Sequence, residues 1–189
     1  MKKLLIVVDM INGFITEGAL ADPVISRIIP GCKEYIEEFL AADQDIIAFC
    51  DTHMPECREF SAYPSHCLIG SRESELVDEL LPYKEKITII PKNSTNGFMA
   101  AGFEPYRKKL DDYKEIYIVG CCSDICVMQL ALSLRTFINE NDWQTDIIVD
   151  SRACDTFSLP GHDRDEYNKI AFALLANSGV RVLGGRDDE

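Results

Sequence analysis

The chain has 189 residues, 47% of them hydrophobic, and a formal net charge of −13 at pH 7. This length and composition fit one globular domain with a full hydrophobic core, expected to span residues 1–189, and argue against intrinsic disorder. The negative charge disfavours nucleic acids and anionic membrane surfaces as partners, because the field of the protein would repel phosphate groups.

The sequence also bears on membrane insertion and on compartment. No apolar run approaches the roughly 20 residues that a membrane span needs. The apolar start Leu4–Val8 is cut by Asp9 before any cleavage site, so it predicts a first strand in a cytoplasmic protein rather than a signal peptide. The eight cysteines are scattered, which favours reduced thiols, with a disulfide between Cys121 and Cys122 as the alternative.

Short apolar runs alternate with helical patterns along the chain. The runs that predict strands are Leu4–Val8, Asp45–Cys50, Ile87–Ile90, Ile116–Val119, Thr145–Val149 and Val180–Leu183. The segments that predict helices are Gly31–Ala42, Glu73–Leu81, Phe103–Leu110, Ile125–Asn139 and Asp163–Ser178. The segment Asp150–Asp155 predicts a capped turn. Strands separated by helices imply right-handed crossovers, so we predict an α/β fold with three αβα layers around a central, mainly parallel sheet of about six strands.

Polar side chains follow four of the predicted strands. Asp9, Asp51 and Lys92 each lie within two residues of a strand end, and Cys126 follows the fourth strand. Each has an ordinary explanation when taken alone, as a turn aspartate, a solvated lysine or a small packed cysteine. Because ligands bind at the carboxyl ends of the strands in open α/β sheets, the coincidence of all four at that edge favours a functional site.

The stretch Gly120–Val127 predicts a reactive position for Cys126. Gly120 ends the strand, and Ser123 or Asp124 can cap the following helix. Cys126 then falls in the first helical turn, where unpaired N–H groups and the helix dipole stabilise a thiolate. A nearby carboxylate could take the proton, an ammonium could supply a counter-charge, and two N–H groups could hold an oxyanion.

The long loop Thr52–Gly70 carries a second group of polar residues. Asp51 and His53 are two residues apart, so in extended backbone they face the same way. His66 follows His53 by thirteen residues, and Glu59 lies between them. Two histidines with one or two carboxylates suit Zn²⁺, Mn²⁺ or Fe²⁺, which predicts a metal site in this loop.

Other interpretations stay open for several side chains. The loop residues could be ordinary polar groups, or Cys57 or Cys67 could belong to a structural zinc site. His162, near the start of the last helix, is interpreted as a surface or capping residue. Aromatic side chains belong to the core by default. Those that could instead stack on a planar ligand are Phe14, Phe98 and Tyr106.

Taken together, these motifs resemble the isochorismatase-like cysteine hydrolases, and within that family the nicotinamidases. The matching stretches are Leu5–Phe14, Asp51–His53, Pro64–Ser71, Pro91–Lys92 and Gly120–Val127. Two features depart from the family pattern. Ser123 stands where the family often has threonine, and the segment Lys92–Tyr106 shows no clear aromatic clamp for a substrate.

The resemblance implies roles for particular residues. The catalytic residues would be Asp9, Lys92 and Cys126. A cis peptide bond would join Cys121 to Cys122, and the N–H groups of Cys122 and Cys126 would hold the oxyanion. A divalent metal, with zinc expected first and manganese or iron as alternatives, would be held by Asp51, His53, His66 and, as a further carboxylate, Glu59. Phe14 would contact the substrate.

The same resemblance implies the reaction. Nicotinamide would be hydrolysed to nicotinic acid and ammonia through a thioester on Cys126, a step of NAD salvage, with the metal binding the pyridine nitrogen. One alternative is a related cysteine amidase with another amide, carbamoyl or ureido substrate. A second is a non-catalytic, acidic α/β binding module. For the enzyme, the expected partner is a small amide, and we also expect a homo-oligomer.

Overall fold

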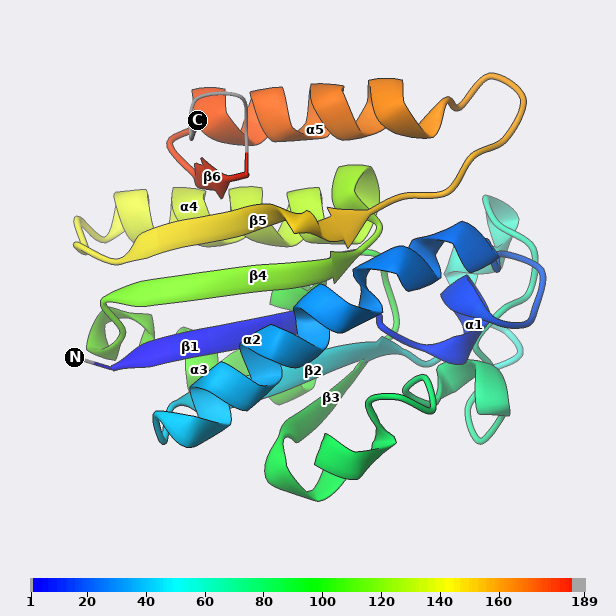
Figure 1. The fold of residues 1–189 in the computed structure, drawn as a ribbon, viewed down its shortest axis with the longest axis horizontal. Coiled ribbons are helices and arrows are strands. Elements are labelled where there is room, and N and C mark those ends of the chain that lie inside the picture. Colours follow the sequence, from blue (N-terminus) through cyan, green and yellow to red (C-terminus); the bar gives the residue numbers. More distant parts are fainter. Residues whose placement is uncertain (1, 185–189) are drawn as a thin grey trace.

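The computed structural model describes residues 2–184, and its centre is a parallel sheet of six strands in the order β3-β2-β1-β4-β5-β6 (Figure 1). The strands are β1 (Lys3–Val8), β2 (Asp45–Asp51), β3 (Thr88–Lys92), β4 (Glu115–Cys121), β5 (Asp146–Asp155) and β6 (Arg181–Leu183). Each neighbouring pair runs parallel. The predicted fold class is thus confirmed, and the sheet is parallel throughout.

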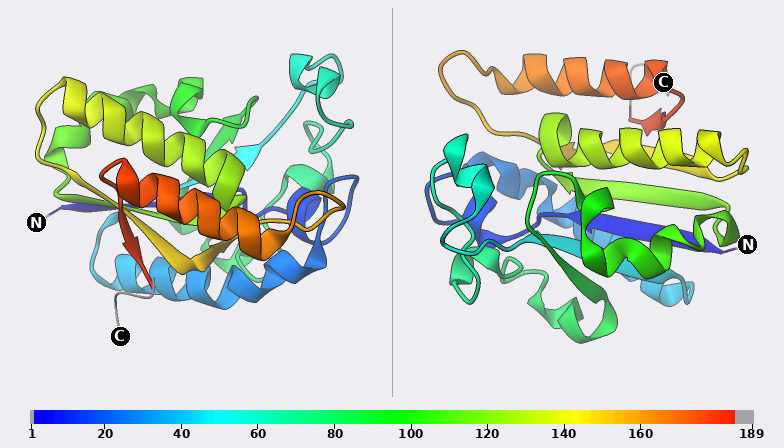
Figure 2. Two further views of the ribbon diagram at one scale, coloured as in Figure 1. Left: turned by 90° about the horizontal axis from the view of Figure 1, so that it is seen from above. Right: turned by 180° about the vertical axis from the view of Figure 1, so that it is seen from behind.

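Helices cover both faces of the sheet (Figure 2). They are α1 (Asn12–Ile15), α2 (Ile29–Ala41), α3 (Glu104–Arg107), α4 (Met128–Glu140) and α5 (Arg164–Asn177). Successive residues of a strand point to opposite faces, so Leu5 packs in the core under α2 and Ile6 in the core under α4. Within residues 2–184, no helix combines the length and apolar character needed to cross a membrane.

The strand order places a topological switch point between β1 and β4. From β1 the chain proceeds outward through β2 and β3 on one side, and through β4, β5 and β6 on the other. Ligands of open α/β sheets bind at such a point, beyond the carboxyl ends of the strands. Asp9 follows β1 and Cys126 follows β4, so these two residues flank the switch point.

The predicted helix over Glu73–Leu81 is wrong. A 3₁₀ turn at Arg72–Ser74 gives way to chain that lies against the segment after β1. The N–H of Val77 donates to the carbonyl of Met10 (3.1 Å), and the N–H of Asn12 donates to the carbonyl of Glu75 (3.0 Å). The segment buries its apolar residues and forms backbone hydrogen bonds to a loop that is distant in sequence. Together these outweigh its local preference for a helix.

Two other boundaries differ from the sequence prediction. The helix expected over Phe103–Leu110 is α-helical only at Glu104–Arg107, with 3₁₀ turns on both sides. The segment Asp150–Asp155 is not a capped turn, because β5 continues through it after a register shift opposite Gly120. This extension carries Asp155 to the carboxyl edge of the sheet.

Candidate active site and metal centre

The carboxyl edge of the sheet brings four predicted site residues together. The ammonium Nζ of Lys92 lies 2.9 Å from Oδ2 of Asp9, 2.7 Å from Oδ1 of Asp51 and 3.8 Å from Sγ of Cys126. All four side chains are buried. One buried ammonium thus joins the thiol to two carboxylates, which compensates charges that would be costly to bury alone.

The backbone fixes both carboxylates. Asp51 and Lys92 are the last residues of β2 and β3 and pair directly in register. Asp9 has a φ of 51°, a left-handed conformation that is uncommon for a residue other than glycine. It is held there by a bond from its N–H to the carbonyl of Phe49 (3.0 Å), while its Oδ1 accepts from the N–H of Asp51 (3.0 Å).

A tight turn positions the cysteine. Gly120 has a φ of +118°, and a side chain there would place Cβ 2.0 Å from the carbonyl oxygen of Val8, so only glycine fits. The Cys121–Cys122 peptide bond is cis, as the resemblance implies. A single π-helical turn, Ser123–Val127, follows and contains Cys126, and α4 continues from it.

The predicted cap of this helix is wrong. Ser123 donates its hydroxyl to Oδ1 of Asn168 in α5, and neither it nor Asp124 accepts a backbone N–H at the helix start. Oδ2 of Asp124 instead lies 2.8 Å from Nε2 of His162.

The prediction for His162 is also wrong, because its ring is largely buried and stacks on Phe157 with a centroid separation of 4.1 Å.

The sequence predicted that the start of a helix stabilises the thiolate form of Cys126, but the surroundings of this side chain favour the thiol. Burial raises the pKa of Cys126 well above its ordinary value, and the neighbouring carboxylates add to this, while Lys92 acts in the opposite direction. Burial also raises the pKa of Asp9 to about 6, although Lys92 opposes the change. Cys126 therefore rests as a thiol, and its reaction needs a proton acceptor.

The predicted metal ligands form one cluster. The ligand atoms of Asp51, His53, Glu59 and His66 all lie within 4.8 Å of one another. Oδ2 of Asp51 is 3.2 Å from Nε2 of His53 and 3.3 Å from Nε2 of His66. Oε1 of Glu59 lies 3.9 Å from each of these nitrogens.

The hydrogen bonds around the two histidines fit a bound cation. Nδ1 of His53 faces Oδ1 of Asn93 (2.9 Å), and Nδ1 of His66 faces the carbonyl of Pro64 (2.8 Å). Both partners are acceptors, which places the ring proton on Nδ1 and directs the Nε2 lone pair into the cluster. Nε2 of His53 is buried and has no hydrogen-bond partner. Without an ion, burial lowers the pKa of His53, but contact with Asp51 outweighs this and raises the pKa to about 9. The position at Nε2 therefore attracts positive charge, and a bound cation would take the place of the Nε2 proton.

The donor set suits zinc or a similar divalent ion, with two imidazoles and one or two carboxylates. No cysteine belongs to this cluster. Sγ of Cys57 contacts Nδ1 of His53 (3.2 Å), on the side of the ring away from Nε2, and Cys67 is buried elsewhere. All eight cysteines are free.

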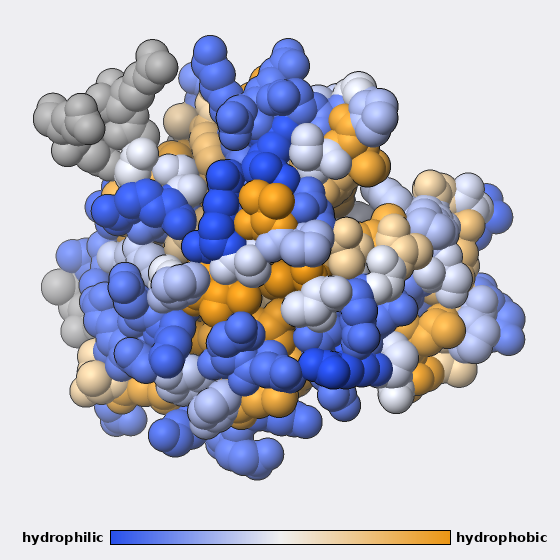
Figure 3. Space-filling model, turned by 45° about the vertical axis from the view of Figure 1, so that its right-hand side comes forward, coloured by the Kyte–Doolittle hydropathy of each residue, from blue (hydrophilic) through white to orange (hydrophobic). Residues whose placement is uncertain are grey.

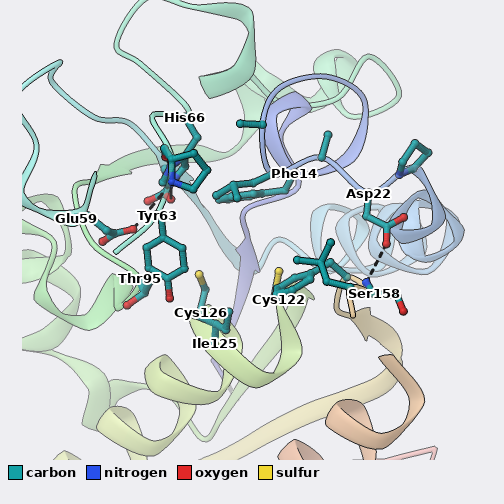
Figure 4. A pocket seen from close by; sticks show the side chains of 18 residues that line it. Phe14, Asp22, Glu59, Tyr63, His66, Thr95, Cys122, Ile125, Cys126 and Ser158 are labelled. Carbon is teal, nitrogen blue, oxygen red and sulfur yellow. Dashed lines mark hydrogen bonds and ion pairs between the residues drawn. The ribbon is translucent and has the colours of Figure 1, made fainter. Parts of the chain in front are cut away.

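A cavity of about 440 Å³ opens above Cys126 (Figure 4). The metal cluster lies at one end with Tyr63, while Asp22 and Ser158 lie at the other. Phe14 lines the cavity, with its ring centroid 5.8 Å from that of His66. The space-filling view, with this edge of the sheet turned forward, shows apolar surface between hydrophilic rims (Figure 3).

Sequence reasoning missed part of this lining. Tyr63 precedes His66 by three residues, and this spacing within the metal loop is the signal that could have found it. Asn93, which contacts His53, directly follows Lys92. Phe98 and Tyr106 pack against the core as aromatic residues usually do and do not line the cavity.

Comparisons with known proteins agree with this geometry. Residues 3–185 match the isochorismatase domain family. Nicotinamidase 1 from Arabidopsis thaliana is 33% identical over 174 residues, which cover 84% of this chain and 71% of that protein.

Two solved structures share the fold. Pyrazinamidase of Pyrococcus horikoshii in complex with zinc has a TM-score of 0.80 and 25% identity, covering 97% of this chain and 99% of its own. N-carbamoylsarcosine amidase from Thermoplasma acidophilum has a TM-score of 0.78 and 26% identity, covering 100% and 98%. The family match spans far more than half of the sequence, so this chain belongs to the isochorismatase family of hydrolases.

Proposed function

We propose that the protein is a metal-dependent nicotinamidase that converts nicotinamide and water to nicotinic acid and ammonia. The observation that carries this proposal is the position of Lys92, whose ammonium contacts Cys126, Asp9 and a ligand of the metal cluster, Asp51. Similarity to a plant nicotinamidase and to a zinc-containing pyrazinamidase supports it. The free cysteines support a cytoplasmic location, and self-association stays a prediction.

The first half of the reaction makes a thioester. Asp9 takes the proton of the Cys126 thiol as Sγ attacks the carboxamide carbon. The N–H groups of Cys122 and Cys126 hold the oxyanion that forms on the carbonyl oxygen. Asp9 then gives its proton to the amide nitrogen, the C–N bond breaks, and ammonia leaves.

The second half restores the enzyme. Asp9 takes a proton from water, whose oxygen attacks the thioester carbon, and the C–S bond breaks to release nicotinic acid. The proton returns to Sγ of Cys126. Lys92 keeps a positive charge between the carboxylates and the sulfur throughout, because burial lowers its pKa but Asp9, Cys126 and Asp51 together raise it well above the usual value.

The metal cluster serves binding rather than proton transfer. Asp51, His53, His66 and Glu59 would hold the ion, which when bound supplies a Lewis acid for the ring nitrogen of the substrate. Phe14 and Tyr63 line the same end of the cavity and would contact the ring. These contacts orient the carboxamide over Cys126.

Ammonia release from nicotinamide tests the proposal. The metal-loaded protein should release ammonia and nicotinic acid in equal amounts, and Cys126→Ala should abolish turnover while keeping the metal. Activity that survives Cys126→Ala would contradict the mechanism.

A second candidate is an amidase for a carbamoyl compound, which similarity to N-carbamoylsarcosine amidase favours. Full activity on such a compound after removal of the metal would select it over the first. If the protein releases ammonia from none of the amides tested, the non-catalytic binding module is the interpretation that remains.

A further inference from the structure

We propose that this enzyme requires a primary carboxamide but accepts an acyl group larger than a pyridine ring, whose apolar substituent lies in the half of the cavity beyond Cys122. This inference rests on the proposed function and specifies the substrate class of the same site. It follows from two features, a closed environment around the leaving group and an open, apolar extension on the acyl side.

The leaving group has little space. In the proposed mechanism the amide nitrogen receives its proton from Asp9, so it must face that carboxyl group. Asp9 is 0% exposed, and the cavity is lined by Cys126 but not by Asp9 or Lys92. The carboxyl group is enclosed by the ammonium of Lys92 at 2.9 Å and by the N–H of Asp51 at 3.0 Å. An amide nitrogen that reaches Asp9 would therefore be surrounded by buried protein, and we expect space there for hydrogen atoms but not for a carbon substituent.

The acyl side is open. The cavity volume of about 440 Å³ falls in the range of roughly 300–1,000 Å³ that is typical for ligands larger than one ring. Nicotinamide bound at the metal end, between Phe14 and Tyr63, would fill only part of it. The remainder continues past Cys122 toward Asp22 and Ser158 (Figure 4). We call this part the distal half.

The distal half is mainly apolar. The apolar lining residues that adjoin Asp22 and Ser158 along the chain are Ala19, Leu20, Ala21, Phe157 and Leu159. Its one charged group is already satisfied, because Oδ2 of Asp22 accepts from Arg164 (2.9 Å) and from the N–H of Ser158 (3.0 Å). Leu159 is 61% exposed, so an apolar ligand group at this position would remove hydrophobic surface from water.

Geometry selects the ring position that carries the substituent. With the ring nitrogen at the metal cluster and the carbonyl carbon over Cys126, the ring carbons remote from the nitrogen face the distal half. The substrate class is therefore nicotinamides with an apolar group at such a carbon, for example carbon 5.

Three amides test this on the metal-loaded, full-length enzyme. They are nicotinamide, 5-phenylnicotinamide and nicotinamide methylated on the amide nitrogen, with acid product followed by chromatography. We expect kcat/KM for 5-phenylnicotinamide to equal or exceed that for nicotinamide, and kcat/KM for the N-methyl amide to be at least about 100-fold lower. Loss of activity with the phenyl compound, or equal activity with the N-methyl amide, would overturn the inference.

A pair of variants tests the location. Leu20→Trp should fill the distal half and lower the ratio of the two kcat/KM values, phenyl compound over nicotinamide, by at least about tenfold. Val24→Trp is the matched control, because Val24 is exposed and does not line the cavity, and the ratio should not change. An unchanged ratio in Leu20→Trp, with the variant folded by circular dichroism, would contradict the assignment.

Failure of this inference is distinguishable from failure of the proposed function. Biphenyl-3-carboxamide has the same shape as the phenyl compound but lacks the ring nitrogen. Hydrolysis of this amide without hydrolysis of nicotinamide would reject the nicotinamidase and keep the larger acyl group. Hydrolysis of nicotinamide, with neither of the larger amides hydrolysed, would keep the nicotinamidase and reject the larger acyl group.

Discussion

Lys92 is a buried lysine, only 2% exposed, and its single charge is shared between two carboxylates. It ends an apolar strand, so the sequence indicated that it projects from the carboxyl edge, although a lysine at such a position is usually solvated. The structure distinguishes the two, since Nζ contacts Asp9, Asp51 and the carbonyl of Ser94. Removing one partner of such a buried network leaves charge without compensation, which is more costly than losing the pair.

Lys92→Met should therefore destabilise the metal-free protein strongly. We expect the free energy of unfolding to fall by about 3–5 kcal/mol, because Asp9 and Asp51 would be left buried without their cation. Urea denaturation of both proteins measures it. Lys33→Met is the control, because Lys33 is exposed and its ion pair with Glu37 is long, at 3.9 Å. This substitution should change the free energy of unfolding by less than about 0.5 kcal/mol. Equal stabilities for both variants would contradict the charged network.

Individual residues were predictable from sequence where a strand end fixed their position. Asp9, Asp51, Lys92 and Cys126 were found in this way. Asn93 was not, because its role depends on a ring nitrogen of His53 that lies forty positions away in sequence. No local pattern encodes a contact of that kind.

Asn93→Ala should weaken metal binding. Without the amide oxygen at 2.9 Å, Nδ1 of His53 loses the acceptor that holds its ring and tautomer, and we expect metal affinity to fall about 10–100-fold. Competition with a chromogenic chelator measures this without any activity assay. Asn96→Ala is the matched control in the same loop, because the Asn96 amide bonds Ser133 rather than a metal ligand. Identical affinities in the two variants would show that Asn93 does not orient His53.

At the scale of elements, alternating strands and helices were predictable because their periods differ, and the six strands lie where the apolar runs indicated. Two segments failed for one physical reason, long-range pairing. Glu73–Leu81 bonds to the loop after β1, and Asp150–Asp155 extends β5 beside β4. Tertiary partners determined both, and a local window does not contain them.

The extension of β5 links α5 to the turn that holds the cysteine. Asp155 is buried at the strand end and accepts two hydrogen bonds from Arg27 (2.7 and 3.0 Å). The amide nitrogen of Asn168 donates to Asp155 (2.8 Å), and the hydroxyl of Ser123 donates to the amide oxygen of Asn168. Asn168 thus connects a fixed carboxylate to the start of the π-helical turn that carries Cys126.

Asn168→Ala should impair catalysis more than binding. Freeing Ser123 would let the oxyanion-binding turn shift, and displacements of about 1 Å can cost on the order of 100-fold in rate. We expect kcat with nicotinamide to fall about 10–100-fold, with KM and metal content changed less than about threefold. Asn177→Ala, at the exposed end of the same helix, is the control. A rise in KM at constant kcat would instead assign Asn168 to substrate binding.

At the scale of the whole molecule, the net charge is −13, yet several carboxylates each have their own hydrogen-bond or ion-pair partners in the fold. Asp150 is buried near the β5–β6 pairing, and it accepts from Tyr35 (2.7 Å) and from the side chain of Arg152 (3.0 and 2.8 Å). Burial raises the pKa of Asp150, but these hydrogen bonds outweigh it and hold the pKa below its usual value. Burial likewise raises the pKa of Asp22 and Asp45, but hydrogen bonds and nearby cations outweigh it and the pKa is lowered. The pKa of Glu115 is lowered mainly by a hydrogen bond from Lys3.

These pairs make stability depend on pH with a definite sign. A carboxyl group whose pKa is lower in the folded than in the unfolded chain stabilises the fold above its unfolded value, near 3.8 for aspartate, and this contribution is lost as pH falls through the folded value. The stability that these lowered carboxyl groups contribute should therefore fall as pH drops below about 4. Asp150→Asn should be less stable than the parent at pH 7, by about 1–3 kcal/mol, and this difference should shrink at pH 3 because the parent loses the same carboxylate. Glu34→Gln, an exposed position on α2, should follow the parent at every pH. Calorimetric scans between pH 7 and pH 3 measure the stability of the parent and of both variants. A difference between the parent and Asp150→Asn that stayed constant with pH would mean that ionised Asp150 does not stabilise the fold.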